Sequence, residues 1–569
     1  MKQIILSFGL FLVCGLAPLS QSSAQTGSKS INDQVDGVFK RWNKSDSPGC
    51  ALGVIKDGEL IYKRGYGMAD IERKVPITPS TVFNIGSITK QFTAACIALL
   101  AQQGKISLED NIRKYVPEIP EFRAPITIRH LVHQTSGLRD FYDLTEIAGR
   151  DYETAEQGAI LELLAGQKEL NFNPNEQHLY CNGCYDLLAI IVKRASGLSL
   201  HEFAERNIFK PLGMIHTTIK DNRTIPPNSA LSYEPNSNKF RLRIPNDQLV
   251  GSHGVWTTIE DLLLWDQNFY SGKIGGQSFI EQMYARGVLN DGNEIDYAFG
   301  LNVGHYRGLK TVAHAGGDIG YRSQFSRFPD QKFSFICLCN TYTSPGGLVE
   351  KVADLYLADR FKNPVREFSK SPAPLRLSKQ ELAAKTGVYW NEEERKSIRV
   401  YLEDGKLRLA IGSNHYTLLP LNKNRFQLLG YPDQICFDPP DVDKPQWMRH
   451  IDNNDEVTSY GATNPPALTW EQLKEYAGAY RSEELKSGLT INLMEGRIRL
   501  IIDEAAQAKS EPHSLDGTVL ELLPLFADTY QCGHGCYLNF MRNSQRKVTG
   551  FKLNMPYTNF LLFSKTPNN

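Results

Sequence analysis

The sequence has no excess of either charge. Lysine and arginine together number 63, aspartate and glutamate also number 63, and 41% of the 569 residues are hydrophobic. A chain with this balance has no net field that would draw it to nucleic acid or to an anionic lipid surface. The composition therefore argues against nucleic-acid binding and favours a small molecule or a short peptide as the partner.

Long hydrophobic runs are also missing, apart from a short one at the start of the chain. Lys2 is followed by an apolar run from Ile4 to Ala17, which is short for a membrane span. Ser22-Ser-Ala24 has the small residues of a cleavage site, so residues 1–24 are predicted to be a signal peptide cleaved near Ala24. A retained anchor is the alternative. The mature protein is predicted to be exported, periplasmic or secreted, without stable membrane insertion.

Cysteine is scarce for a chain of this length. There are ten cysteines, and those that follow the predicted signal peptide are odd in number, so they cannot all pair within the chain. Most are expected to be buried small hydrophobic residues. Two pairs lie close enough in sequence to form disulfides in an oxidising compartment: Cys181 with Cys184, and Cys532 with Cys536.

Spacings typical of metal sites are lacking as well. Cys532-Gly-His-Gly-Cys536 has soft ligands, but three ligands so close together, without a second pair nearby, make a poor tetrahedral zinc site. A glycine-rich loop or a local disulfide is the preferred interpretation. His130 and His133 lack the glutamate of a metalloprotease motif. We therefore predict neither a metal nor a cofactor.

The chain is too long for one hydrophobic core, and its pattern changes along its length. Residues 31–365 alternate predicted strands and helices, which favours an α/β (α+β) domain. Cys50–Ile55 and Leu60–Tyr66 form a predicted hairpin, and Gln91–Gln103 has apolar side chains at helical spacing. A polar linker with prolines is predicted at Arg366–Arg376.

The rest of the chain contains an internal repeat of short predicted strands. Pairs at a displacement of 91 residues are Leu377 with Leu468, Leu382 with Leu473, Gly387 with Gly478, Tyr389 with Tyr480, Glu392-Glu393 with Glu483-Glu484, Gly405 with Gly496, Arg408 with Arg499, and Val457-Thr458 with Val548-Thr549. We predict two all-β barrel domains, at residues 372–464 and 465–569, because closure of a sheet removes its exposed edges.

The second copy of the repeat carries an insertion. Leu418–Leu421 matches Leu522–Leu525 at a displacement of 104, so 13 residues have been added within Asp503–Gly517. The added segment contains Asp503, Glu504, Glu511 and Asp516. It is interpreted as a solvated loop. The alternative hypothesis is that it reaches the catalytic pocket and selects substrates with a free amine.

Three short motifs carry the candidate chemistry. The first, Ser87-Ile-Thr-Lys90, stands at the start of the predicted helix Gln91–Gln103. Positions three apart share a helix face, so the lysine amine can reach the serine hydroxyl and take its proton. A helix start also offers N–H groups to a developing oxyanion. Alone, the motif also fits a helix-capping serine followed by a surface lysine.

The second motif is Tyr180-Cys-Asn182, which precedes a helix predicted from Tyr185. A phenol near a lysine can be held as phenolate and act as general base toward the serine. An asparagine amide can donate to a substrate carbonyl and accept from its amide. By itself this tripeptide is more often a turn at a strand end.

The third motif is His314-Ala-Gly316-Gly317. Its small residues would let a substrate backbone lie against a strand edge, with the Gly317 N–H as a second oxyanion donor. Alone, it fits a glycine turn with a hydrogen-bonded histidine.

Together, and in this order, the three motifs resemble those of the serine β-lactamase and penicillin-binding-protein family. The resemblance is to its class C β-lactamase-like branch, which includes esterases and D-aminopeptidases. It extends to Phe83–Ser87, Ile128–Leu138 and Thr257–Leu262, and covers roughly Asp33 to Arg360. It implies a catalytic domain with an antiparallel sheet flanked by helices.

The resemblance also implies roles for single residues. Ser87 would be the acylated nucleophile, and Lys90 and Tyr180 would handle protons. The implied substrate-binding residues are Asn182, His314, Gly316 and Gly317.

One departure from the family pattern bears on the substrate. β-Lactamases usually have a lysine at the start of the third motif, whereas this chain has His314, which is mostly neutral near pH 7. A histidine at this position resembles the esterase and aminopeptidase members of the family, so efficient β-lactam hydrolysis is not expected. A catalytic domain followed by two barrels also resembles the three-domain D-aminopeptidases.

The resemblance thus implies a serine hydrolase that cleaves an amide or ester bond through a Ser87 acyl-enzyme. The leading substrate is a short peptide that contains a D-amino acid. The alternatives are a carboxylesterase acting on short acyl esters and a non-catalytic protein that binds a peptide or wall fragment.

Overall fold

The structure is a computed structural model that describes residues 30–150, 154–220, 225–237, 239–363 and, with short gaps, 375–567. The predicted signal peptide (1–24), most of the predicted linker and the insertion within 503–517 lie outside the described residues. Within the described residues, no helix combines the length and the apolar character needed to cross a membrane.

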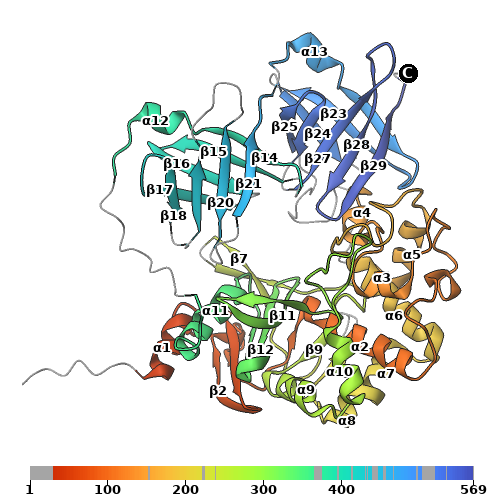
Figure 1. The fold of residues 1–569 in the computed structure, drawn as a ribbon, viewed down its shortest axis with the longest axis vertical. Coiled ribbons are helices and arrows are strands. Elements are labelled where there is room, and N and C mark those ends of the chain that lie inside the picture. The colour runs from red at the N-terminus through yellow and green to blue at the C-terminus, as the bar shows by residue number, and fades with distance from the viewer. Residues whose placement is uncertain are drawn as a thin grey trace, which may run out of the picture.

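The first domain is built on a six-stranded antiparallel sheet in the order β10-β11-β12-β13-β1-β2 (Figure 1). The strands are β10 Asn302–Tyr306, β11 Leu309–Asp318, β12 Tyr321–Phe328, β13 Phe333–Cys339, β1 Cys50–Lys56 and β2 Glu59–Tyr66. Shorter strands are β3 Met68–Asp70, β4 Val75–Pro76, β5 Phe83–Asn84, β6 Thr218–Ile219, β7 Ser232–Asn236, β8 Lys239–Arg243 and β9 Val255–Thr257.

Helices cover both faces of this sheet. They are α1 Ile31–Phe39, α2 Thr89–Gln102, α3 Ile128–Val132, α4 Phe141–Ile147, α5 Gln157–Ala165, α6 Asn182–Ser196, α7 Leu200–Ala204, α8 Lys210–Leu212, α9 Ile259–Ser271, α10 Gly276–Tyr284 and α11 Pro345–Tyr356. Strand β1 shows the two cores: Leu52 and Val54 pack with α1 and α11, whereas Ala51 and Ile55 pack with α2 and α9. Successive side chains of a strand point to opposite faces, so a strand covered on both sides is apolar throughout.

Helix α2 crosses the larger core and places the first motif. All of its side chains from Thr89 to Leu100 are buried, which is typical of a helix surrounded by protein. It starts two residues before the predicted helix and follows a 3-10 turn, Gly86–Ile88. Helix α6 likewise begins at Asn182 rather than at the predicted Tyr185. Both motifs therefore lie at helix starts.

Three disulfides are present, one more than sequence proximity predicted. Cys181–Cys184 and Cys532–Cys536 are paired as predicted, and Cys50–Cys339 is paired as well. The last two residues are 289 positions apart but lie opposite each other on β1 and β13. The free cysteines of the described residues are Cys96, Cys337 and Cys436, so the expectation that most cysteines are simple buried hydrophobic residues is wrong.

Two closed barrels follow, as predicted. The first contains β14 Gly387–Asn391, β15 Lys396–Glu403, β16 Lys406–Ile411, β17 Asn414–Pro420, β18 Arg425–Leu428, β19 Gln434–Phe437, β20 Trp447–Ile451 and β21 Val457–Ala462, after helix α12 Lys379–Ala383. The second contains β22 Gly478–Ser482, β23 Ser487–Met494, β24 Arg497–Ile502, β25 Leu520–Phe526, β26 Thr529–Cys532, β27 Tyr537–Arg542, β28 Val548–Met555 and β29 Thr558–Lys565, after helix α13 Trp470–Lys474.

The repeat holds for the first strands, but its last match is wrong. Strands β14, β15 and β16 correspond to β22, β23 and β24 at the displacement of 91. Val457-Thr458 begins β21, the eighth strand of the first barrel, whereas Val548-Thr549 begins β28, the seventh strand of the second. The insertion before β25 increases the displacement between corresponding residues after it. The match of the two Val-Thr pairs is therefore a coincidence, because valine and threonine are common in strands.

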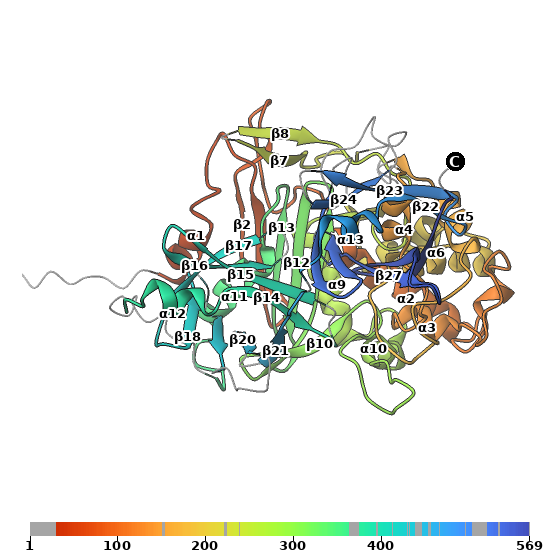
Figure 2. The same ribbon diagram turned by 90° about the horizontal axis from the view of Figure 1, so that it is seen from above.

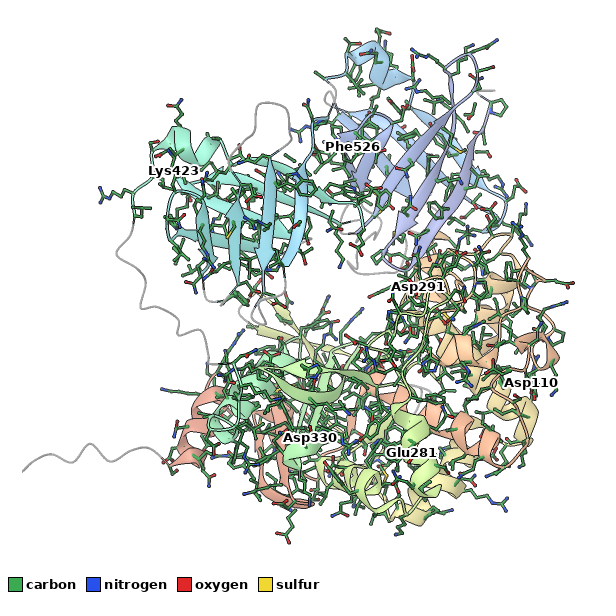
Figure 3. All side chains as sticks on the ribbon, viewed as in Figure 1. Asp110, Glu281, Asp291, Asp330, Lys423 and Phe526 are labelled. Carbon is green, nitrogen blue, oxygen red and sulfur yellow. A yellow bond between two sulfur atoms is a disulfide. The ribbon has the colours of Figure 1, made fainter. Side chains whose placement is uncertain are left out.

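The second barrel packs on the first domain near α4, and the two barrels touch each other (Figure 1, Figure 2). The Arg139 guanidinium and the Glu484 carboxylate form an ion pair of 2.7 Å between the first domain and the second barrel. Between the barrels, the Trp390 ring lies 6.3 Å from that of Phe526, which Figure 3 labels at this junction.

Candidate active site

Ser87 and Lys90 lie side by side, as the sequence predicted. Ser87 is in the 3-10 turn Gly86–Ile88, and Lys90 is in the first turn of α2. The Lys90 Nζ is 3.0 Å from the Ser87 Oγ, which is hydrogen-bond distance. The spacing of three residues brings the amine onto the hydroxyl because both side chains project from one face of the helical turn.

The Lys90 side chain is fully buried, and two further acceptors hold it. Its Nζ donates to the Asn182 Oδ1 at 2.8 Å and to the Ser252 carbonyl oxygen at 3.0 Å. Burial lowers the pKa of Lys90 to about 7, although the charges of Asp186 and Asp140 act in the opposite direction. Near neutral pH a large share of the amine is therefore unprotonated and able to accept the proton of the serine hydroxyl.

Activity should increase as the Lys90 amine loses its proton. The neutral amine is the proton acceptor and its pKa is about 7, so kcat/KM is expected to rise with pH with a midpoint near 7. Asp186→Asn should move this midpoint to lower pH, because the charge of Asp186 raises the pKa of Lys90. Rates measured with a neutral ester from about pH 5 to about pH 8 check both expectations. A flat profile would show that Lys90 is not the titrating base.

Tyr180 lies against Lys90 as a neutral phenol. The Lys90 Nζ is 4.7 Å from the centre of the Tyr180 ring. Burial raises the pKa of Tyr180 well above its usual range, and Tyr297 adds to the effect, whereas a hydrogen bond with Ser87 opposes it. The phenolate considered from the sequence is therefore disfavoured. A neutral phenol can donate a hydrogen bond, and Lys90 is then the candidate for the base.

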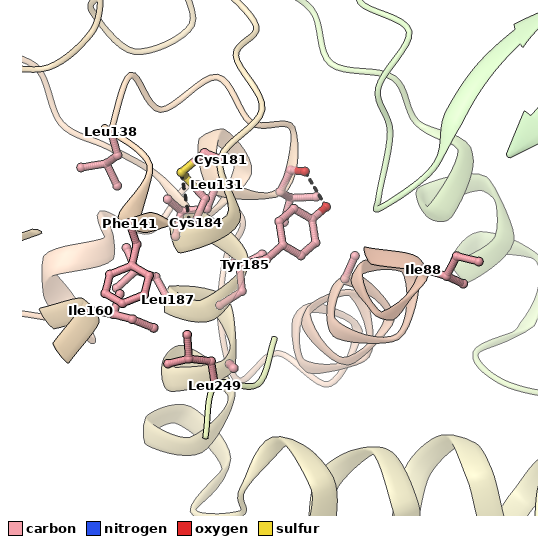
Figure 4. Close-up of a cluster of buried hydrophobic side chains, with 14 of the residues drawn as sticks. Ile88, Leu131, Leu138, Phe141, Ile160, Cys181, Cys184, Tyr185, Leu187 and Leu249 are labelled. Atoms are coloured by element: carbon pink, nitrogen blue, oxygen red, sulfur yellow. Dashed lines mark hydrogen bonds between the residues drawn. A yellow bond between two sulfur atoms is a disulfide. The ribbon is translucent and has the colours of Figure 1, made fainter. Parts of the chain in front are cut away.

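Asn182 is fixed by the local structure at the start of α6, where Figure 4 labels the neighbouring Cys181 and Cys184. The Cys181 Sγ accepts from the Cys184 N–H at 3.1 Å, and the disulfide between these residues closes the turn. The Asp140 Oδ2 accepts from the backbone N–H of Asn182 and, at 3.2 Å, from that of Gly183. A carboxylate at a helix N-terminus satisfies N–H groups that have no partner within the helix.

The glycines of the third motif pack against the turn that carries Ser87. A Cβ atom at Gly86 would lie 2.6 Å from the Gly317 nitrogen, and one at Gly316 would lie 2.0 Å from the Ile85 carbonyl oxygen. The close approach of two backbones therefore requires glycine at these positions. It brings the backbones of Gly86 and Gly317 together beside the pocket that Ser87 and Gly317 line, so the N–H groups of Ser87 and Gly317 are candidate oxyanion donors.

His314 lies behind the pocket wall, not in it. Its side chain is 4% exposed, with the Nε2 atom 3.2 Å from the Tyr297 hydroxyl and the Nδ1 atom 2.6 Å from the Ala315 carbonyl oxygen. On β11 it points inward, whereas Ala315 and Gly317 point outward, because side chains alternate along a strand. Burial, with the nearby Lys90, lowers the pKa of His314 to about 4, so the ring is neutral.

The pocket has a volume of about 460 Å³ and is lined by more groups than the motifs contain. Of the predicted set, Ser87, Tyr180, Asn182 and Gly317 line it. The other lining residues are Asp140, Tyr142, Asp143, Ser252, His253, Asp318, Ile319, Arg322, Tyr342 and Tyr557. Asp318 and Ile319 had a sequence signal, because they directly follow the third motif.

Tyr557 comes from the second barrel, in the turn between β28 and β29, and no local sequence pattern connects it with the site. Its ring centre is 5.8 Å from that of Tyr180. Its backbone N–H donates to the Asp143 Oδ2 at 2.8 Å, and its carbonyl oxygen accepts from the Asp140 N–H at 3.2 Å. The barrel therefore forms part of the pocket wall.

Carboxyl groups outnumber cations around this pocket, among the described residues. The carboxyl groups in and directly behind its wall belong to Asp140, Asp143, Asp186, Asp247 and Asp318, and the cations are Lys90, His253 and Arg322. Burial raises the pKa of Asp140 and Asp318, raises that of Asp143 well above its usual range, and raises that of Asp186 to about 6. A ligand cation would favour the ionised form of these acids.

His253 balances part of the negative charge. Burial alone would lower its pKa, but the charges of Asp247 and Asp318 raise it to about 9. The His253 Nε2 is 2.7 Å from the Asp247 Oδ1, and ligand atoms of these three residues lie within 4.8 Å of one another, a spacing that a metal ion could use. Because the two carboxylates favour the protonated imidazole, we interpret the group as an ion-pair cluster.

This arrangement suits acyl transfer through a covalent intermediate. It combines a hydroxyl, a buried amine within hydrogen-bond distance, a neutral phenol and backbone N–H groups at one end of a pocket. These are the parts that activate a serine nucleophile and stabilise the oxyanion of a tetrahedral intermediate.

The sequence of this chain is similar to those of known proteins. A family model described as Beta-lactamase matches residues 35–358, more than half of the chain. A D-aminopeptidase of Brucella anthropi is 27% identical over 522 residues, which cover 88% of this chain and 92% of that protein. A D-aminopeptidase of Gluconobacter oxydans is 28% identical over 298 residues, 52% of this chain and 56% of that protein.

A solved structure shows a similar fold. The octameric penicillin-binding protein homologue from Pyrococcus abyssi has a TM-score of 0.55 and 23% identity, and covers 76% of this chain and 98% of its own.

Proposed function

This chain belongs to the β-lactamase family of serine hydrolases, and we propose that it removes an amino-terminal residue from short peptides or amides that contain a D-amino acid. The substrate in this proposal is a small molecule with a free ammonium group next to the scissile carbonyl. The Asp318 carboxyl group, which lines the pocket directly after Gly317, carries the proposal. The relatives named D-aminopeptidase support the choice of a D-amino acid.

In the proposed reaction, Lys90 takes the proton of Ser87 as the serine oxygen bonds to the scissile carbonyl carbon. The backbone N–H groups of Ser87 and Gly317 stabilise the resulting oxyanion. The carbon–nitrogen bond then breaks, and the amine leaves with the proton held by Lys90. Water attacks the acyl-enzyme with Lys90 again as base, which releases the acid and restores the serine. Tyr180 donates to the reacting oxygen, and Asn182 holds the substrate.

A substrate ammonium group has a partner at the end of β11. Asp318 directly follows Gly317 and lines the pocket. Its oxygens accept from the Asn84 Nδ2 at 2.6 Å and from the Ile319 N–H at 2.8 Å, and a carboxylate has further lone pairs for an ammonium. One carbon separates the α-amino group from the carbonyl, so the amine falls near Asp318 when the carbonyl oxygen meets the Gly317 N–H.

The third motif supplies no cation for a substrate carboxylate. The pKa of His314 is about 4, so its ring supplies no positive charge near neutral pH. The Arg322 Nη1 donates to the carbonyl oxygens of Asp318 and Tyr321 at 2.8 Å and 2.7 Å. Penicillins carry a carboxylate near the scissile bond and are therefore expected to be poorer substrates than amides with a free amine.

Paired substrates test the proposal. D-Alanine p-nitroanilide should be hydrolysed, and its N-acetyl form should show kcat/KM at least about tenfold lower, because acetylation removes a charge-assisted contact of about 1.5–3 kcal/mol. The L-alanine compound tests handedness. A preference for the N-acetyl compound would contradict the proposal.

Asp318→Asn should raise KM for the free amine by about tenfold and leave a neutral acyl ester within about twofold. Asp330→Asn is the matched control, because Asp330 is exposed in the turn between β12 and β13 (Figure 3). Equal changes with amine and ester would remove Asp318 from ammonium recognition.

A further inference from the structure

The turn of the second barrel at Tyr557 forms hydrogen bonds with the segment of the first domain around Asp140, which lines the active site. Beyond its contacts with Asp140 and Asp143, the Tyr557 carbonyl oxygen accepts from the Asn171 Nδ2 at 3.1 Å. The Asn171 Oδ1 accepts in turn from the Asn559 N–H at 2.6 Å. Both ends of the turn are therefore held by the first domain.

A second contact lies one residue earlier in the same loop. The Arg139 side chain is completely buried, and its Nη1 donates to the Glu484 Oε2 at 2.7 Å. Its Nε donates to the Asn559 carbonyl oxygen at 3.0 Å. The Glu484 carboxylate also accepts from the Lys168 N–H at 2.9 Å. A buried guanidinium depends on such partners, because without them its charge is left uncompensated.

Asp140, next to Arg139 in the same loop, connects these contacts with Lys90 and Ser87. Asp140 is fully buried, and its Oδ2 accepts from the first N–H groups of α6, those of Asn182 and Gly183. The Asn182 Oδ1 accepts from the Lys90 Nζ at 2.8 Å. An unbroken series of hydrogen bonds thus connects the barrel with the amine that lies 3.0 Å from Ser87.

The repeat shows that this docking is particular to the second barrel. Glu393 is the residue of the first barrel that corresponds to Glu484, in the turn between β14 and β15. Glu393 is exposed, whereas the Glu484 side chain is 8% exposed and paired with Arg139. The glutamate at this position of the repeat is therefore exposed in one copy and binds the first domain in the other.

We propose that the second barrel is a working part of the active site: it holds Arg139 and Asp140, which fix the start of α6 and so position Lys90 on Ser87. Asp140 is a positioning residue in this scheme, and Glu484 acts through it. The proposal rests on the serine hydrolase chemistry at Ser87 and is independent of the substrate's amine.

Glu484→Gln tests the proposal in the full-length protein, with Glu393→Gln as the matched control. A neutral p-nitrophenyl ester is the substrate, so a failure of the proposed amine preference would not affect the result. Glu484→Gln should lower kcat and the rate of fluorophosphonate labelling at least tenfold, with KM within twofold of the parent. Glu393→Gln should match the parent, and Glu484→Asp should recover part of the loss.

The pH profile separates positioning from general damage. The charged or titratable groups around Lys90 are Asp186 and Tyr185 on α6, Asp140 before α4, His314 on β11, and Tyr180. Asp140 raises the pKa of Lys90, so withdrawal of its carboxylate should move the midpoint of kcat/KM to lower pH. A loss of kcat with an unchanged midpoint would mean that Glu484 only stabilises the fold, and would overturn the proposal.

Asn171→Ala decides the matter if Glu484→Gln does not fold. Asn171 is a residue of the first domain whose side chain hydrogen-bonds to Tyr557 and Asn559 of the barrel, and this variant removes that side chain. Asn171 itself does not line the pocket. The variant should lower kcat and shift the pH midpoint in the same direction. A folded Asn171→Ala protein with the parent's kcat and midpoint would also overturn the proposal.

Discussion

Ser87→Ala is expected to abolish turnover and labelling by a fluorophosphonate while leaving the fold intact. Loss of a serine nucleophile lowers kcat by several orders of magnitude, about 10⁴-fold or more, because the acyl-enzyme cannot form. The Ser87 Oγ bonds to Lys90 at the pocket surface, so its removal should change the free energy of unfolding little. Ester hydrolysis, labelling and urea unfolding of parent and variant check these expectations.

A second serine in the same pocket makes this prediction selective. The Ser252 Oγ is 3.1 Å from the His253 Nδ1, and the His253 Nε2 is 2.7 Å from the Asp247 Oδ1. The order of groups is that of a Ser-His-Asp triad. However, the pKa of His253 is raised to about 9, so the ring is protonated near neutral pH and cannot take a proton from Ser252. Ser252→Ala should therefore keep fluorophosphonate labelling at Ser87. Labelling of the parent protein at Ser252, or loss of labelling in Ser252→Ala, would reverse the assignment.

Lys90→Ala should have the second-largest effect, a loss in kcat of about 10²–10⁴-fold, because it removes the general base. The loss of the pH dependence near 7 should accompany it, since Lys90 has the pKa of about 7. Tyr180→Phe should cost less, about fivefold, because a neutral phenol contributes one hydrogen bond of about 1 kcal/mol. Steady-state rates with one ester substrate measure all three effects.

The double variant tests whether the two groups act together. If Tyr180 serves the proton transfer made by Lys90, the double variant should lose little more than Lys90→Ala alone. Losses that multiply would mean separate tasks. A larger loss for Tyr180→Phe than for Lys90→Ala would give the role of base back to the phenol.

Local spacing was enough to predict that Ser87 and Lys90 lie side by side. Ser87 and Lys90 meet because a helix places residues three apart on one face. The protonation states and the burial of the site residues were less predictable. The phenolate of Tyr180 is disfavoured by burial, and burial is a property of the whole fold. His314 is buried behind the wall beside Tyr297 and the Ala315 carbonyl oxygen, which the motif alone does not reveal.

Contacts between distant segments could not be predicted. Arg139 and Glu484 are in different domains, and no pattern at either position indicates the other. Cys50 and Cys339 became partners only through the neighbouring strands β1 and β13. The two barrels were predictable because the repeat records their shared pattern. Its last match failed because an insertion changes the displacement after β24.

Capture of the acyl-enzyme tests the central claim most directly. The parent protein would be mixed with excess D-alanine p-nitroanilide, quenched in acid within the first turnover, digested and analysed by mass spectrometry. The account predicts one added alanyl group on the peptide that contains Ser87, and none on that peptide in Ser87→Ala. Turnover of the substrate with no alanyl adduct at Ser87, or with an adduct at Ser252, would contradict it.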